Sequence, residues 1–121
     1  MKILITNDDG YKYEALELLV TLSQKYGEVY VVAPKNEQSA KSHSINIREG
    51  FEVERINDRF IAISSTTADC VRYAHYHEKL DFDIVFSGIN KGYNAGEDIM
   101  YSGTVAGVIE AGFINKRGIA F

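Results

Sequence analysis

The sequence predicts an α/β protein with a doubly wound, mostly parallel sheet and a small β insertion. Three observations favour this fold class. Short apolar, β-branched runs alternate along the chain with segments of helical spacing. The apolar runs are continuous, as is typical of strands covered on both faces. Polar loops follow several of these runs directly, and in such sheets ligands bind beyond the carboxyl ends of the strands.

The first half of the chain supplies strands, one helix and the β insertion. Lys2 to Thr6 is an apolar, β-branched run that predicts a buried strand. Apolar residues then recur at helical spacing from Ala15 to Leu22, and Gly27 provides a stop. Further strands are predicted at 28–33, 45–47, 51–56 and 60–63, with a polar loop at 35–44 and a turn at Asn57-Asp58.

The second half continues the alternation of helices and strands. Helical spacing predicts a helix from Asp69 to Lys79, and Asp83 to Phe86 is a buried strand. A loop rich in Gly and Asn, Ser87 to Ser102, precedes an apolar helix from Thr104 to Ile114. Gly118 to Phe121 begins like one more strand. Without repeats or a linker, residues 1–121 are expected to form one domain.

Composition restricts the function classes. Hydrophobic residues make up 45% and charged residues 25% of the 121 residues, which is typical of a globular protein. The single Cys70 excludes an intrachain disulfide and a cysteine zinc cage and favours a cytoplasmic location. No apolar run reaches the roughly 20 residues of a membrane span. The net charge of −4 argues against a nucleic acid polymer as partner.

Two adjacent carboxylates follow the first strand. Asp8 and Asp9 stand between Asn7 and Gly10, where two like charges repel and each loses hydration. One interpretation is a helix cap or a solvated strand end. The favoured one is a site for Mg²⁺ or Mn²⁺, which prefer oxygen ligands and commonly bridge to phosphate. Ser39, in the loop after the second strand, offers a hydroxyl to the same edge of the sheet.

The loop from Ser87 to Ser102 ends where a helix should begin. Asn90 offers either an oxygen to a metal or amide donors to an anion. Ser102, Gly103 and Thr104 stand at the predicted helix start, whose free N–H groups and positive dipole end suit a phosphate. The alternative is that Ser102 only caps the helix. The length of the loop favours a functional role.

Several other polar residues have simpler interpretations. His43 is expected to bond to backbone or substrate rather than to a metal. Lys35, Lys41 and Lys91 are expected to be solvated, and Cys70 to pack inside its helix.

Four segments, "ILITNDDG", "VVAPKNEQSAKSHSINI", "TADCV" and "SGINKGYNAGEDIMYSGTV", resemble in order and spacing the SurE survival-protein family of nucleotide phosphatases. The resemblance covers essentially the whole chain. It implies a Rossmann-like, metal-dependent phosphatase acting on nucleoside 5′- and 3′-monophosphates, and in some members on short polyphosphate, with a dimeric or tetrameric assembly. The family's metal ligands fall on Asp8, Asp9, Ser39 and Asn90, and its phosphate-holding turn on Ser102, Gly103 and Thr104. Asp8 and Asp9 are then the catalytic pair.

The sequence departs from the family pattern in three places. Tyr11 to Glu14 replaces a small Pro/Gly-containing segment, and Ser65-Thr66-Thr67 replaces Gly-Thr-Pro. Family members also continue into a second part that shapes the substrate pocket. We therefore expect these 121 residues to bind metal and phosphate but to turn over nucleotides poorly, and to self-associate through the apolar C-terminal strand or to belong to a longer protein.

Three alternatives to the phosphatase fit the sequence to different degrees. A phospho-acceptor receiver module needs an Asp closing its third strand and a Lys closing its fifth, whereas Ile63 runs into Ser64-Ser65 and Phe86 into Ser87. A P-loop kinase or ATPase is excluded because no G-x-x-x-x-G-K-[ST] occurs. A fragment that binds metal and phosphate without turnover remains open, as does the nucleophile, either water with Asp9 or Asp8 as base, or an Asp carboxylate.

Overall fold

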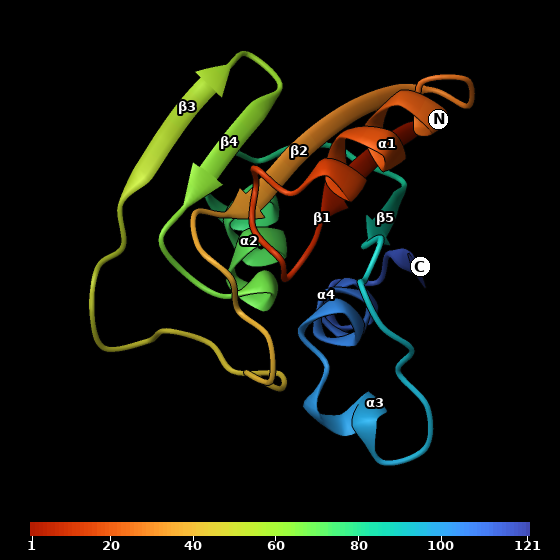
Figure 1. Cartoon of the computed structure of the whole chain (residues 1–121). Helices are drawn as coiled ribbons and strands as arrows, with labels where there is room; N and C mark the ends of the chain where they lie inside the picture. The colour runs from red at the N-terminus through yellow and green to blue at the C-terminus, as the bar shows by residue number, and fades with distance from the viewer.

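A six-stranded sheet forms the centre of the computed structural model, which describes all of residues 1–121 (Figure 1). The strand order is β3-β4-β2-β1-β5-β6, and every neighbouring pair is parallel except the antiparallel pair β3 and β4. The strands are β1 (Lys2–Thr6), β2 (Glu28–Pro34), β3 (Val53–Asn57), β4 (Phe60–Ile63), β5 (Ile84–Ser87) and β6 (Arg117–Ala120). The predicted doubly wound α/β fold with a β insertion is confirmed.

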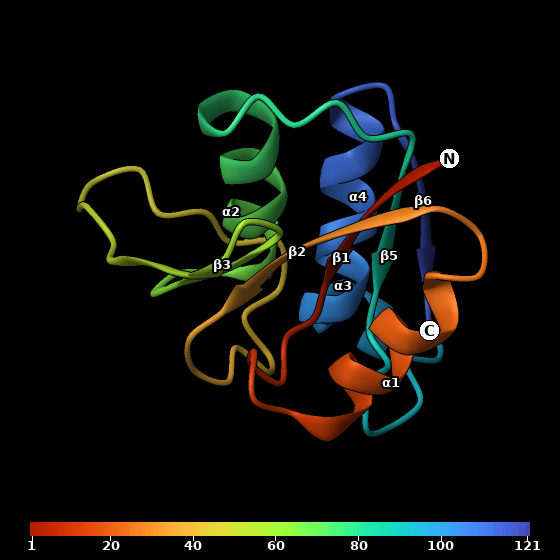
Figure 2. The ribbon, with the colours of Figure 1, turned by 90° about the horizontal axis from the view of Figure 1, so that it is seen from above.

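Helices cover both faces of the sheet (Figure 2). Because side chains alternate across a strand, Ile3 and Ile5 of β1 pack with α1, while Leu4 packs on the opposite side with α2 and α4. The helices are α1 (Glu14–Ser23), α2 (Thr67–Arg72), which continues into the π-helical turn η1 (Tyr73–His77), α3 (Asp98–Tyr101) and α4 (Gly103–Phe113). None of them is long and apolar enough to cross a membrane.

The structure corrects the boundaries of several predicted elements. The strand predicted at 45–47 is absent, since Ile45 and Ile47 are exposed and pair with no strand. The helix predicted at 69–79 begins at Thr67, because the Thr66 hydroxyl caps it by accepting a hydrogen bond from the Asp69 amide, and it ends in the π-turn η1. The loop predicted at 87–102 contains the short helix α3.

The order of the strands places a crevice beyond the carboxyl end of β1. The chain builds outward from β1 through β2 and β4 on one side and through β5 and β6 on the other, so β1 and β5 flank the point where the winding direction switches. Loops after such strands diverge and leave room for a ligand. The loops after β1, β2 and β5 all reach this edge. We call the second of these, residues 35–52 between β2 and β3, the Ser39 loop.

Candidate functional site

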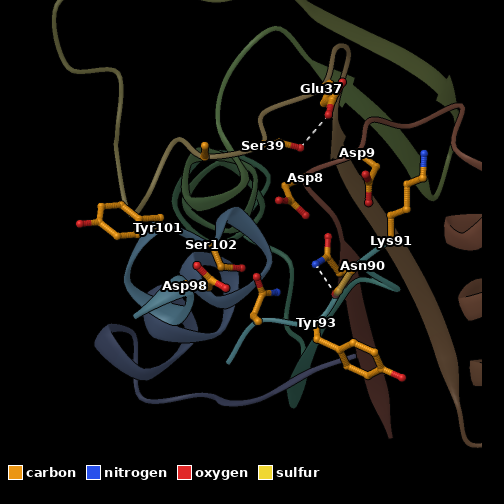
Figure 3. A pocket seen from close by; sticks show the side chains of 13 residues that line it. Asp8, Asp9, Glu37, Ser39, Asn90, Lys91, Tyr93, Asp98, Tyr101 and Ser102 are labelled. Carbon is orange, nitrogen blue, oxygen red and sulfur yellow. Dashed lines mark hydrogen bonds between the residues drawn. The ribbon is translucent and has the colours of Figure 1, made fainter. Parts of the chain in front are cut away.

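A cleft of about 450 Å³ opens at this edge of the sheet (Figure 3). Its walls come from the turn after β1, the Ser39 loop, the loop after β5, and the segment leading into α4. The polar and charged side chains predicted from sequence converge here with others. The lining residues are Asp8, Asp9, Glu37, Ser39, Ala40, Asn90, Lys91, Gly92, Tyr93, Asn94, Asp98, Tyr101 and Ser102.

Asp8 lies at the base of the cleft and is firmly held by the protein. Only 4% of the residue is exposed. Its Oδ1 accepts a hydrogen bond of 2.5 Å from the Thr104 hydroxyl, and its backbone oxygen accepts one of 2.6 Å from the Gln38 amide. Asp8 therefore joins the start of α4 to the Ser39 loop, and the Thr104 side chain is already engaged with Asp8.

Gly103 permits the close approach of α4 to Asp8. A Cβ atom at position 103 would lie 2.6 Å from the Cβ and 3.0 Å from Oδ2 of Asp8. One helical turn further on, a Cβ at Gly107 would lie 2.9 Å from the Ser87 Oγ. Because these two glycines on one face of α4 have no side chains, the helix packs in direct contact with the ends of β1 and β5.

Asp9, unlike Asp8, has a buried carboxylate oxygen that no protein donor reaches. Its Oδ2 is buried and has no hydrogen-bond partner in the protein. Burial, the adjacent Asp8 carboxylate and Glu37 raise the pKa of the Asp9 carboxyl above its ordinary value, and Lys91 partly opposes them. Asn7 fixes the turn that carries both carboxylates, since its Nδ2 donates to the Gly10 carbonyl at 2.9 Å.

Asn90 and Ser39 face the acidic pair from the two neighbouring loops (Figure 3). The Asn90 Nδ2 donates to the Gly92 carbonyl at 2.7 Å, which fixes the side chain with its oxygen as the remaining acceptor. The Ser39 hydroxyl donates to the Glu37 carboxylate at 2.8 Å. That bond occupies the hydroxyl proton and leaves the oxygen lone pairs available to a cation.

The first residues of α4 present the positive end of the helix to the cleft. Ser102 caps the helix, because its Oγ accepts from the Val105 amide and its carbonyl accepts from the Ala106 amide. The amides of Gly103 and Thr104 therefore remain without a partner inside the helix. The capping role and the predicted anion-binding role of this segment are compatible, since they use different groups.

The donor set fits a hard divalent cation. Carboxylate, hydroxyl and amide oxygens suit Mg²⁺ or Mn²⁺, and the buried, unpartnered Oδ2 of Asp9 lacks a positive counterpart that such an ion would provide. No group of three or more His, Cys, Asp or Glu side chains is placed to hold a metal. A site here accordingly depends on the Ser and Asn oxygens as well as on the two carboxylates.

Other predicted residues lie outside the cleft or differ from expectation. His43 bonds to the Glu110 carboxylate rather than to backbone or substrate. Lys35 pairs with Glu52 and Glu54, whereas Lys41 is exposed and Cys70 is buried as predicted.

Sequence reasoning missed Glu37 and Asp98 as lining residues and treated Lys91 only as a solvated lysine. The signal was available for all three residues, because each stands within a loop that was predicted to meet the others at this edge.

Three comparisons relate the chain to known proteins. A family model described as "Survival protein SurE" matches residues 3–121. Curated relatives named 5′-nucleotidase SurE are 44% identical in Myxococcus xanthus (strain DK1622) and 50% identical in Clostridium botulinum (strain ATCC 19397 / Type A), over 99% of this chain. The chain spans about half the length of these relatives, 47% and 50% respectively. The crystal structure of Sure protein from Aquifex aeolicus superposes with a TM-score of 0.94 at 38% identity, covering 100% of this chain and 50% of that one.

Proposed function

Because the chain belongs to the SurE survival-protein family, we propose that it carries the metal- and phosphate-binding site of a phosphatase that hydrolyses nucleoside 5′- and 3′-monophosphates. The observation that carries the proposal is the acidic pair, with Asp8 buried, placed against a helix start. Asp8 contacts the first turn of α4, and Asp9, which has a buried oxygen without a partner, lines the same cleft as the residues leading into that helix. A cation and a phosphate would each meet groups of complementary charge there.

In this proposal Asp8, Asp9, Ser39 and Asn90 hold Mg²⁺ or Mn²⁺. When bound, such a cation neutralises phosphoryl oxygens and polarises the scissile P–O bond. The protein's own groups bind the phosphate and carry out the attack on phosphorus. The amides of Gly103 and Thr104 hold phosphate oxygens at the helix start. Asp9 or Asp8 either takes the proton of an attacking water or itself attacks phosphorus, and in both cases the bond from phosphorus to the nucleoside oxygen breaks and the nucleoside leaves.

The partners and location follow as parts of the same proposal. The substrate is a nucleoside monophosphate, and the assembly is a homo-oligomer, dimeric or tetrameric. An exposed apolar surface on β6, where Ile119 is 45% exposed, and at the adjoining Phe121, 47% exposed, supports association of copies. The single buried Cys70 supports a cytoplasmic location.

A nucleotide panel tests the activity directly. Phosphate release from nucleoside 5′- and 3′-monophosphates is measured with Mn²⁺, with Mg²⁺ and with EDTA. Asp9→Asn is the test variant, and Lys41→Ala is the matched control on an exposed side chain of the same wall. We expect slow release that EDTA and Asp9→Asn abolish and that Lys41→Ala retains.

Other outcomes of this assay separate the alternatives. Mn²⁺ and phosphate binding without release would favour a binding role without turnover. Release that is insensitive to EDTA would refute the metal-dependent mechanism.

A further inference from the structure

We propose that His43 and Glu110 are positioning residues for the cleft. Their hydrogen bond ties the Ser39 loop to α4, the helix whose first turn contacts Asp8, and so fixes the distance between the two walls that carry the metal ligands. The inference rests on the proposed function, because it explains how one of the proposed ligands is held in place.

Glu110 is a buried carboxylate with a partner for each oxygen. Its side chain is 3% exposed. Oε1 accepts from Nη1 of Arg72 on α2 at 3.0 Å, and Oε2 lies 2.8 Å from Nε2 of His43. Since a carboxylate can only accept, Nε2 of His43 is the donor. One side chain of α4 thereby joins this helix to α2 and to the Ser39 loop.

The His43 ring is held by packing as well as by the hydrogen bond. It stacks on Phe113, the last residue of α4, with ring centroids 5.3 Å apart and an interplanar angle of 26°. The side chain is 25% exposed. His43, four positions after Ser39, therefore holds the loop against the last turn of α4.

Few other contacts hold this part of the loop. Residues 35–52 contain no helix or strand, and most of them are exposed. Ala40 and Ser42 have φ values of +58° and +52°, a region that residues other than glycine rarely adopt. Such a conformation persists only where contacts enforce it. The other hydrogen bonds from this part of the loop to the rest of the protein join the Gln38 amide to the Asp8 carbonyl, the Ser42 amide to the Tyr101 carbonyl, and the Thr66 hydroxyl to the Ser44 carbonyl. Only the His43 bond joins this part of the loop to α4 itself.

The contact between His43 and Glu110 and the contact between Gly103 and Asp8 lie along one face of α4. Glu110 follows Gly103 by seven residues, which is close to two full turns, so both point from the same side of α4. Gly103 meets Asp8, and Glu110 meets His43. A rigid helix thus sets where the Ser39 loop stands relative to the acidic pair.

Stability alone does not account for this arrangement. Glu110 is the one charged residue of α4, an otherwise apolar and small-residue helix. Replacing a buried ion pair with well-packed apolar side chains is often neutral or stabilising. A buried carboxylate that binds two separate elements specifies their positions, and that is what a metal site built across two loops requires.

The test measures Mn²⁺ affinity by calorimetric titration of four proteins. His43→Leu removes the donor at similar volume, His43→Gln restores an N–H at comparable reach, and Lys41→Ala is the control in the same loop. We expect the affinity to fall about tenfold in His43→Leu, in line with other residues that orient metal ligands, and to return to near the wild-type value in His43→Gln. Lys41→Ala should match the wild type.

A purely structural role would lower the melting temperature of His43→Leu while leaving its Mn²⁺ affinity unchanged, and that result would overturn the inference. So would an equal loss in His43→Gln. If His43→Leu does not fold by circular dichroism, His43→Phe, which keeps an aromatic ring against Phe113 but has no donor, carries the same expectation. Absence of Mn²⁺ binding in the wild type would instead refute the proposed function on which the inference rests.

Discussion

Replacing Gly103 with Ala should destabilise the protein and weaken cation binding, although glycine-to-alanine changes within helices ordinarily stabilise. The new Cβ would lie 2.6 Å from the Asp8 Cβ, far closer than two carbons can approach. Asp8 cannot easily retreat, because its carboxylate is bonded to Thr104 and its backbone oxygen to the Gln38 amide. Either α4 lifts from the sheet or the turn carrying the acidic pair shifts.

The expected magnitude follows from overpacking a buried contact. Forcing an extra methyl group into a packed site costs about 1–3 kcal/mol. At Gly112, on the same helix, an added Cβ would meet no atom within 4 Å apart from its chain neighbours and the nearby helix backbone, so Gly112→Ala should gain about 0.5–1 kcal/mol from reduced backbone freedom. The two variants therefore shift the free energy of unfolding in opposite directions. For a domain of this size each kcal/mol corresponds to a change in melting temperature of about 4 °C.

The assay pairs thermal unfolding with Mn²⁺ titration for the wild type and both variants. We expect Gly103→Ala to melt about 4–12 °C below the wild type and to bind Mn²⁺ more weakly, while Gly112→Ala melts slightly higher and binds normally. If Gly103→Ala instead stabilised the protein as Gly112→Ala does, with unchanged Mn²⁺ affinity, the close contact between α4 and Asp8 would not exist as described.

Three further predictions concern the acidic pair and the core. Mn²⁺ at a hundredfold excess over its dissociation constant should stabilise the wild type by about 2.7 kcal/mol, seen as a rise in melting temperature, and Asp8→Asn should abolish most of that rise without unfolding the protein. In metal-free protein the pKa of Asp9 is raised above its ordinary 3.8, mainly by burial, so the folded state loses stability as pH rises from about that value through the raised pKa. Asp9→Asn in EDTA should therefore be more stable than the wild type near neutral pH, with the difference vanishing towards pH 4 in denaturant titrations. Burial raises the pKa of the Cys70 thiol, so Ellman's reagent should label it only as the protein unfolds, and rapid labelling of the native state would contradict the packing of α2.

The sequence was informative wherever local pattern and tertiary burial agree. The apolar runs at β1, β2 and β5 and the helical spacing at α1 and α4 all belong to elements that pack into the two cores. Local pattern misled at Ile45 and Ile47, whose alternation is typical of a strand, because no neighbouring strand is available for pairing and the segment is tied to α2 through the Asn46 amide and Asp69. The boundary of α2 was missed for a similar reason, since Thr66 was not interpreted as its cap.

The residues that line the site could be predicted from the sequence, but the hydrogen bonds that hold them in place could not. That loops after parallel strands meet at one edge follows from topology, and it placed Asp8, Asp9, Ser39 and Asn90 together. The hydrogen bond between Thr104 and Asp8 spans 96 positions of the chain, and no periodicity reports such a contact. Glu110 is recognisable in the sequence as a lone charged residue in an apolar helix. Its partners His43 and Arg72 lie on other elements, so these contacts are known only once the elements are packed together.

The two adjacent carboxylates have different positions in this structure, and the difference explains why a chain would keep both. One carboxylate oxygen of Asp8 accepts a hydrogen bond from the Thr104 hydroxyl, so the protein itself stabilises the charge of Asp8 and orients its side chain. Asp9 has a buried oxygen with no donor, and its charge is opposed by burial, by Asp8 and by Glu37. A cation between them would gain little by satisfying Asp8 further but would relieve the unfavourable burial and repulsion at Asp9. In the proposed metal site Asp8 therefore sets the geometry on which binding depends, and the repulsion relieved at Asp9 adds to the affinity for the cation.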